Sequence, residues 1–516
     1  MKKRMIKSVV SGSILLIVIT NLVKLPIRVN ADKLEVMWSE NYGGSLQDII
    51  KSVIHTSDGG YIAVGYSHGV SDNLTPHDWG NEQSGSYCDG IIIKMNADGS
   101  VAWTKNYGGI YSERFHKVIE TINGYLIVGE SYNVSTNIGN SNDWGTVAAY
   151  DGIILEIDHS GTVLWTKNYG GQSFDYFYDV ITTANGYLIA GASHDISTNI
   201  GGSNDWGNEG DYDGILIEVD PTGNVLWAQN YGGPGMDYFN SVVATANGYL
   251  VVGYSYNVST NLGGTNDWGN LGGRDAILLA VDTNGDVLWS KNLGGTRDDG
   301  FNDILETTNG YLIAGYSGGV SINLGGSNDW GTEGGSDGIL VEVDANGDIL
   351  WSQNYGSPIY DSFVSVIETV HGYLVVGSSN GISRNLSNAN DWGNQGGSDG
   401  ILMEVDTHGI VLWSQNYGGS GDELFSNSVA AANGYLVVGY SNGVSTNIGG
   451  TNDWGNQGGD DAIFIFTFEP VSVVNVHNPI TVLSPATRVE NGVIEWLLLF
   501  GIATLGINRV MKIKRT

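Results

Sequence analysis

The chain has 516 residues and a formal charge of −33, although only 15% of its residues are charged. An acidic excess of this size repels nucleic acid and anionic lipid surfaces, so binding of DNA or RNA is excluded. The 77 Gly against 8 Pro fit many tight turns, and the single cysteine, Cys88, leaves no disulfide framework.

The N-terminal segment is predicted to direct export. MKKRMIK is a basic start, residues 8–23 are apolar, and Val29-Asn30-Ala31 offers a small residue for cleavage. We therefore expect residues 1–31 to be a signal peptide, with an uncleaved membrane anchor as the alternative. This segment contains six Lys and Arg and no acid, so its removal lowers the charge from −33 to −39.

Two tryptophan motifs repeat along the rest of the chain. The first step is 65 residues, and every later step is 62. One Trp precedes a turn of the NYGG type, at Trp38, Trp103, Trp165, Trp227, Trp289, Trp351 and Trp413. The other belongs to DWG, at Trp79, Trp144, Trp206, Trp268, Trp330, Trp392 and Trp454. Such self-similarity predicts units that bury themselves against their neighbours.

Each unit contains four short apolar runs. Near the end of the chain they are GILMEVD, IVLWSQN, SNSVAA and GYLVVGYS, separated by Gly, Asn and Asp. The last of these is too apolar to alternate, as expected of a strand covered on both sides. Asp-Thr-His-Gly between the first two predicts a hairpin. Four antiparallel strands, repeated radially, form a propeller blade.

The ends of the array predict how it closes. Residues 33–44 match only the fourth strand of a unit, and residues 461–468 match only the third. The first strand of the chain therefore completes the last blade, and no sheet edge stays open. We predict an all-β, seven-bladed β-propeller over residues 33–468, closed by an N-terminal strand and flanked by the signal segment and a C-terminal apolar tail helix.

The repeat resembles a known family. W-x-K-x-Y-G-G-x3-D, T-x-x-G-Y-[IL]-x-x-G, D-x-[IL] and [VI]-D-x-x-G, seen at residues 103–109, 121–129 and 151–161, are similar to secreted bacterial and archaeal propeller repeats. The resemblance covers residues 33–468 and implies the architecture. This chain departs from it by lengthening the loop between second and third strands with S-T-N-x-G-G-x-N-D-W-G-N-x-G-G, so that loop is expected to carry what distinguishes the protein.

The C-terminal segment lacks the repeat motifs of the propeller. Residues 469–492 are predicted to be a linker, and the apolar run 493–507 is followed by the basic end NRVMKIKRT. The run is shorter than the ~20 residues of an upright span, but the basic end obeys the positive-inside rule. We expect residues 493–516 to be a membrane anchor. A degenerate cell-wall sorting signal at residues 483–487 and a helix packed on the propeller are the alternatives.

Acids are predicted to gather at one face. One set opens the first strands, at Asp48, Glu113, Asp175, Asp237, Asp299, Asp361 and Glu423. Another opens the third strands, at Asp89, Asp151, Asp213, Asp275, Asp337, Asp399 and Asp461. Both loops of a propeller that precede these strands open on the same side.

Calcium is one hypothesis for this face, because Ca²⁺ takes oxygen ligands that flexible Gly-rich loops can supply. The same spacing recurs in four repeats, at Asp205, Asn208 and Asp213, at Asp267, Asn270 and Asp275, at Asp391, Asn394 and Asp399, and at Asp453, Asn456 and Asp461. None matches an EF-hand loop. In the alternative, these side chains accept backbone N–H groups and fix their own loops.

Sugar binding is the other hypothesis. The candidate ligand-binding rings are Trp206, Trp268, Trp330, Trp392 and Trp454, with Tyr111, Tyr176, Tyr178, Tyr238 and Tyr360. A flat ring beside carboxylates and amides is a common carbohydrate platform. The alternative is that the DWG tryptophans pack between blades.

The sequence favours binding over catalysis, because no nucleophile motif, phosphate loop or His cluster stands out. The first repeat deviates slightly, at His77 and Cys88, and so does the second, at Glu113, Arg114, His116 and Val147. We expect an exported, surface-anchored monomer that binds glycan or protein through the acidic face. An extracellular polysaccharide-acting enzyme with paired carboxylates, or a structural surface-layer component, are the alternatives.

Overall fold

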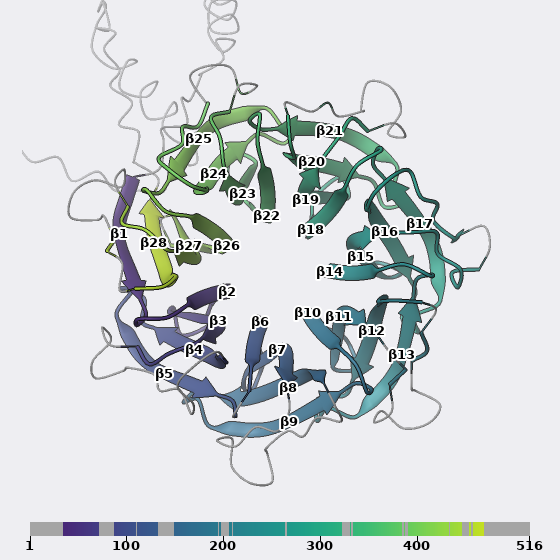
Figure 1. Ribbon diagram of the computed structural model, residues 1–516. Coiled ribbons are helices and arrows are strands. Elements are labelled where there is room, and N and C mark those ends of the chain that lie inside the picture. The colour runs from purple at the N-terminus through teal and green to yellow at the C-terminus, as the bar shows by residue number, and fades with distance from the viewer. Residues whose placement is uncertain are drawn as a thin grey trace, which may run out of the picture. The chain divides into compact units, whose positions relative to one another are not determined.

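The computed structural model describes residues 35–71, 87–109, 111–132, 149–194, 196–197, 206–208, 210–263, 266–321, 331, 334–383, 386, 391–432, 434–445, 454–455 and 458–468. These residues form 28 β-strands in seven four-stranded antiparallel sheets. Figure 1 shows the sheets arranged around a common axis, each with its first strand innermost and its fourth strand outermost. Each sheet is one blade of the predicted seven-bladed propeller.

The first four blades follow the chain in order. Blade 1 contains β2 (Asp48–His55), β3 (Tyr61–Ser67), β4 (Asp89–Met95) and β5 (Val101–Tyr107). Blade 2 contains β6 (Glu113–Glu120), β7 (Gly124–Tyr132), β8 (Tyr150–Asp158) and β9 (Val163–Tyr169). Blade 3 contains β10 (Asp175–Thr182), β11 (Tyr187–Ser193), β12 (Asp213–Val219) and β13 (Val225–Tyr231). Blade 4 contains β14 (Asp237–Thr245), β15 (Gly248–Ser255), β16 (Asp275–Val281) and β17 (Val287–Leu293).

The last three blades include the closing strand. Blade 5 contains β18 (Asp299–Glu306), β19 (Tyr311–Ser317), β20 (Asp337–Val343) and β21 (Ile349–Tyr355). Blade 6 contains β22 (Asp361–Glu368), β23 (Tyr373–Ser379), β24 (Asp399–Val405) and β25 (Val411–Tyr417). Blade 7 contains β26 (Glu423–Ala431), β27 (Gly434–Ser441), β28 (Asp461–Phe468) and β1 (Glu35–Tyr42).

The predicted closure is confirmed. β1 pairs antiparallel with β28, and Trp38 lies opposite Phe466 in the register. The side-chain amide of Asn41 donates to Asp461 at 2.8 Å across 420 residues of sequence. One hydrophobic cluster joins β2 and β3 of blade 1 to β27 and β28 of blade 7. The described residues therefore form a continuous ring, without an unpaired blade at either end.

Hydrophobic packing lies between blades rather than within them. Seven buried clusters lie one at each junction of neighbouring blades. The second and third strands supply most of their side chains; every residue of β12 and β16 is buried. This burial on both faces explains why these strands are apolar throughout rather than alternating.

The hairpins between third and fourth strands tie each blade to the preceding one. In blade 3, Oδ1 of Asp220 accepts the backbone N–H groups of Thr222 at 2.8 Å and Asn224 at 2.9 Å. Gly223 then turns the chain with a φ of 80°. The hydroxyl of Tyr169 in blade 2 donates to the carbonyl of Gly223 at 2.5 Å. The NYGG tyrosine thus fastens one blade to the hairpin of the next.

Several sequence predictions fall outside the described residues. These are the signal peptide over residues 1–31, the linker over 469–492 and the anchor over 493–516. Within the part of the chain that the structure describes, no helix is long and apolar enough to cross a membrane.

Candidate functional site

The acids that open the first and third strands lie at the same end of each sheet, as predicted. In blade 4, Asp237 pairs with Ser255 between β14 and β15, and Ser255 pairs with Asp275 between β15 and β16. The equivalent residues pair in the same way in the other blades. We call this end the loop-bearing edge, because the long loops between second and third strands leave and return there.

Each junction at this edge buries two carboxyl groups, one from each blade. Between blades 3 and 4, Oδ2 of Asp237 accepts the backbone N–H of Gly233 at 2.9 Å. Oδ2 of Asp213 accepts the side-chain amide of Asn230 at 2.6 Å. Burial raises the pKa of Asp237 to about 7, and the nearby Asp213 adds to the rise. Burial likewise raises the pKa of Asp299 to about 7 and that of Asp361 to about 6.

The first Gly of the NYGG turn closes over each carboxyl pair. A Cβ at Gly418 would lie 2.4 Å from Oδ1 of Asp399 and 2.5 Å from Oε2 of Glu423. Any side chain at this position would overlap these carboxyl oxygens, so only glycine fits between them. These pairs therefore pack closely at the junctions.

The DWG tryptophans that the structure describes are buried. Trp206, Trp268, Trp392 and Trp454 are 1–2% exposed and belong to the hydrophobic clusters between blades. Nε1 of Trp268 donates to Ser255 at 2.8 Å, and its backbone N–H donates to Ser259 at 2.8 Å. No ring face is free to stack on a sugar, so the sugar-binding hypothesis is corrected to the packing alternative for these four. Trp330 lies outside the described residues.

The described calcium candidates bond within their own loops. Oδ1 of Asp267 accepts the backbone N–H of Leu262 at 2.9 Å, and Asp391 accepts that of Leu386 at 3.1 Å. Asn208, Asn270 and Asn394 donate to backbone carbonyls three residues ahead.

The last Asp of each predicted calcium-binding set (Asp, Asn and Asp) also has contacts within the protein. Asp275 and Asp399 accept backbone N–H groups and the amides of Asn292 and Asn416. Asp213 and Asp461 belong to the buried carboxyl pairs. Among the residues described here, no three His, Cys, Asp or Glu lie together as metal ligands. These contacts favour the loop-fixing alternative; Asp205, Asp453 and Asn456 lie outside the described residues.

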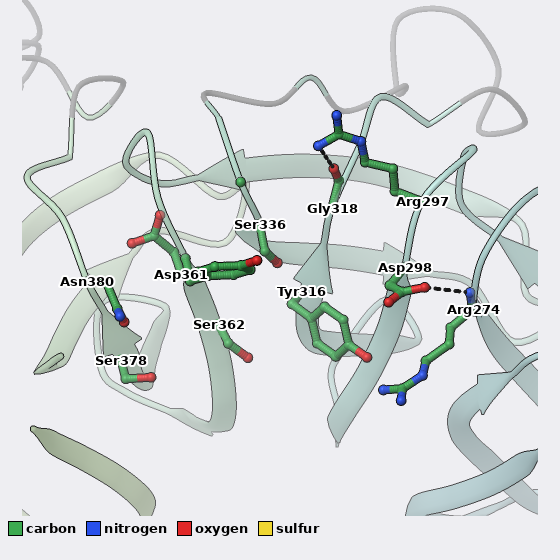
Figure 2. A pocket seen from close by; sticks show the side chains of 12 residues that line it. Arg274, Arg297, Asp298, Tyr316, Gly318, Ser336, Asp361, Ser362, Ser378 and Asn380 are labelled. Carbon is green, nitrogen blue, oxygen red and sulfur yellow. Dashed lines mark hydrogen bonds between the residues drawn. The ribbon is translucent and has the colours of Figure 1, made fainter.

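A pocket of about 460 Å³ lies on the loop-bearing edge, where the loops of blades 4, 5 and 6 meet. Figure 2 shows its side chains coming from the segment before β16, from β19 and from the start of β22 and the end of β23. It is lined by Arg274, Arg297, Asp298, Tyr316, Gly318, Gly335, Ser336, Tyr360, Asp361, Ser362, Ser378 and Asn380. Of the aromatic rings predicted to bind sugar, Tyr360 is in this pocket.

The pocket combines an exposed ring, two guanidinium groups, two carboxyl groups and several neutral polar groups. Tyr360 is 65% exposed. The Arg274 guanidinium lies over the ring of Tyr254 at 4.9 Å and is hydrogen-bonded to the Tyr316 hydroxyl. Nη1 of Arg297 donates to the carbonyl of Gly318 at 3.4 Å, as Figure 2 shows. An aromatic face with a few convergent polar groups is what small-ligand sites usually present.

A second group of polar side chains lies on the innermost strands of blades 1 to 3 and on the second strand of blade 2. This axial cluster consists of Lys51, Arg114, His116, Lys117, Glu130 and Asp179. Glu130 is 3% exposed; it forms an ion pair with Arg114 at 3.3 Å and a short contact with Nε2 of His116. Burial alone would raise the pKa of Glu130, but His116 and Arg114 hold it below its usual value. Lys117 contacts Asp179 at 3.0 Å, so the cluster largely neutralises itself.

The pocket and the axial cluster use positions at which the repeats differ. Glu130 stands where the other second strands have Tyr66, Ala192, Tyr254, Tyr316, Ser378 and Tyr440. Arg274 and Ser336 occupy the position before the third-strand Asp, where other repeats have Cys88, Tyr150, Tyr212, Ser398 and Asp460. Sequence analysis identified Arg114, His116 and Tyr360 but missed Glu130, Arg274 and Arg297. Comparing the repeats at these positions would have found them.

Cys88 is fully buried, as expected of a structural thiol. Burial raises the pKa of this thiol to about 11, although the nearby Arg114 opposes the rise. It is therefore protonated and unreactive at neutral pH.

Comparisons with known proteins do not identify a family for this chain. No protein-family model and no curated protein matches the chain. Among solved structures, it is similar to the quinohemoprotein alcohol dehydrogenase of Comamonas testosteroni, at 12% identity and TM-score 0.41, over 85% of this chain and 78% of that one.

Two further solved structures are similar at the same level. A protein of unknown function from Dyadobacter fermentans matches at 12% identity and TM-score 0.37, over 84% of this chain and 99% of that one. The quinohemoprotein alcohol dehydrogenase ADHIIG of Pseudomonas putida matches at 9% identity and TM-score 0.38, over 88% and 78%. At these levels the likeness carries no information about activity.

Proposed function

We propose that this β-propeller is a non-catalytic, exported binding protein that holds a glycan in the pocket formed by blades 4, 5 and 6. Residues 1–31 would direct it out of the cytoplasm, and residues 493–516 would anchor it in the membrane. The observation that carries the proposal is the pocket of about 460 Å³, in which the exposed ring of Tyr360 adjoins hydroxyl and amide groups.

The pocket offers both kinds of contact that a sugar uses. A sugar ring has an apolar face, which packs on the flat ring of a tyrosine, and a rim of hydroxyls that need partners. Ser336, Ser362 and Ser378 supply hydroxyls at the wall, and Asn380 supplies an amide. Oγ of Ser336 has no hydrogen-bond partner among the described residues, although the residue is only 9% exposed. A buried hydroxyl without a partner is costly, and a ligand hydroxyl would satisfy it.

Catalysis on polysaccharide is the alternative, because Asp298 and Asp361 both line the pocket. Burial brings the pKa of Asp361 to about 6, which suits a general acid. However, Asp361 belongs to the first-strand acids that recur at every junction, and Oδ2 of Asp361 is held by the backbone N–H of Ser357 at 2.6 Å. A carboxyl group that recurs at every junction is explained by its structural role, so binding is the better-supported function.

The test is a glycan array with the full chain, followed by calorimetry on the best hits. Tyr360→Ala should weaken binding at least tenfold while the melting temperature stays unchanged, because the ring packs on nothing that a fold needs. Tyr256→Ala is the matched control, because Tyr256 is also an exposed tyrosine, at 47%, but does not line the pocket. This variant should bind like the parent.

The absence of any hit, or equal binding by the Tyr360 variant, would contradict the proposed binding function. The appearance of new reducing ends during incubation with a hit would instead establish the enzymatic alternative.

A further inference from the structure

We infer that the ligand of this pocket is an acidic sugar with one carboxylate, recognised through Arg274 and Arg297. The inference rests on the proposed glycan-binding function and specifies which class of glycan the pocket selects. It derives from the distribution of positive charge in a chain whose net charge is strongly negative.

Cations are scarce in the propeller. Between residues 34 and 468 the Lys and Arg are Lys51, Lys94, Lys105, Arg114, Lys117, Lys167, Arg274, Lys291, Arg297 and Arg384. Four of them form ion pairs with carboxylates, namely Lys94, Arg114, Lys117 and Lys291. Arg274 and Arg297 form no ion pair with any carboxylate that the structure describes. Two guanidinium groups in one pocket therefore keep their charge available to a ligand.

The guanidinium of Arg274 is held in position without an ion pair. It lies over the Tyr254 ring at 4.9 Å and is hydrogen-bonded to the Tyr316 hydroxyl, and the charge of the nearby Asp298 also acts on it. Oδ1 of the nearby Asp298 accepts the backbone N–H of Arg274 at 3.0 Å rather than its side chain. Figure 2 shows this bond and the guanidinium extending past it toward Tyr316. A preordered guanidinium without an ion pair suits a carboxylate, which it can bind through two parallel hydrogen bonds.

Apart from Asp298, which accepts the backbone N–H of Arg274, and the buried Asp361, the rest of the lining is uncharged and suits the hydroxyl-bearing part of a sugar. The Asn380 side-chain oxygen already accepts the Ser398 hydroxyl at 2.7 Å, which leaves its amide N–H₂ for a ligand. Ser336 presents its unpartnered hydroxyl within the same wall. The arrangement therefore separates the two guanidinium groups, at Arg274 and Arg297, from a part with hydroxyl groups, an amide and the Tyr360 ring.

The overall charge limits how acidic the ligand can be. At physiological salt, electrostatic interactions are screened beyond about 8 Å, so a ligand in the pocket interacts mainly with the charges nearest to it, including the two arginines. A long polyanion would extend beyond the pocket and meet the surface of a chain with a formal charge of −33. A single carboxylate on a neutral oligosaccharide gains the local attraction without that repulsion. The pocket should therefore reject sulfated polyanions.

The experiment uses the full chain and three probes: a glucuronate-terminated disaccharide, the same disaccharide ending in glucose, and a heparin-derived sulfated oligosaccharide. Calorimetry should show the glucuronate probe binding at least tenfold more tightly than the glucose probe, with the sulfated probe weaker than the glucuronate probe. Arg274→Gln and, separately, Arg297→Gln should each weaken binding of the glucuronate probe and remove most of this preference. Lys105→Gln, which makes the same charge change at an exposed site outside the pocket, should alter nothing.

The outcomes are distinguishable. Equal binding of the two disaccharides, a preference that survives both Arg variants, or strongest binding by the sulfated probe would overturn this inference and leave glycan binding intact. Binding of none of the three probes, together with a silent glycan array, would overturn the proposed function itself. The two Arg variants provide independent tests if one of them lowers the melting temperature.

Discussion

The blade junctions and the pocket are built from different kinds of positions in the same repeat. At the junctions, similar residues recur around the ring: a glycine over two carboxyl groups, a buried DWG Trp in the four repeats in which the structure describes it, and at four junctions a tyrosine bonded to the next hairpin. The pocket is built almost entirely from positions that vary, such as Arg274 against Ser336, or Asp298 against Tyr360 in equivalent loops. In this chain, the repeated positions stabilise the ring, whereas positions that differ between repeats line the pocket proposed to bind a ligand. Three perturbations would test that division.

The largest expected effect is a loss of stability as the pH rises. Burial raises the pKa of Asp237 from 3.8 to about 7. Below pH 3.8 both states hold the proton; between pH 4 and 7 the unfolded chain loses it first, so unfolding becomes easier. At about 1.4 kcal/mol per pKa unit, this group alone accounts for roughly 4 kcal/mol, and Asp299 and Asp361 act in the same direction.

Denaturant unfolding at pH 4, 6 and 8 measures this loss, and the midpoint should fall along the series. Asp237→Asn should flatten the decline. Asp58, an exposed acid in a hairpin, has a pKa lowered to about 2, so its effect on stability changes only below pH 4. Acids of this kind should contribute little to the change in stability between pH 4 and 8. A midpoint that is constant or rises toward pH 8 would show that the junction carboxyls are not held protonated.

A smaller effect is expected from filling one junction. Gly418→Ala places a methyl group within 2.5 Å of carboxyl oxygens from two blades, so both must move. We expect a loss of roughly 3 kcal/mol, measured as a fall in the melting temperature. Gly269→Ala is the matched control, because no atom lies within 4 Å of the new Cβ. Equal melting temperatures for the two variants would argue against the junction role of the glycine.

The smallest effect separates the DWG tryptophans from ligand binding. Trp268→Phe removes the Nε1–H that donates to Ser255 at 2.8 Å and leaves some unfilled volume. We expect a loss of about 1–2 kcal/mol and unchanged glycan binding. A loss of binding at unchanged stability would restore the original stacking hypothesis for this ring.

The sequence was sufficient to predict the ring because its evidence is periodic. Residues 33–44 match only a fourth strand and residues 461–468 only a third strand, so the sequence predicted that β1 pairs with β28. The observed strand register confirms this pairing. Whether the DWG tryptophans are buried or exposed was ambiguous, because the repeat spacing does not show whether a long loop folds back onto the blades. Hydrogen bonds from Trp268 to Ser255 and Ser259 hold the ring in its buried position, and the spacing does not reveal these bonds. Arg274 and Arg297 were missed because each occurs once, and only the fold brings blades 4 and 5 to the same pocket.

The pairing of β1 with β28 also sets an order for biosynthesis. During translation, the first strand cannot pair until the last strand has been synthesised. Asn41 can bond to Asp461 only after 420 further residues have been added to the chain. At roughly 5–20 residues per second, that wait is about 20–80 s. Throughout it, β1 has an open edge that could pair with any other nascent strand. Folding of this chain therefore requires conditions, or helper proteins, that keep its first strand unpaired until the ring is complete.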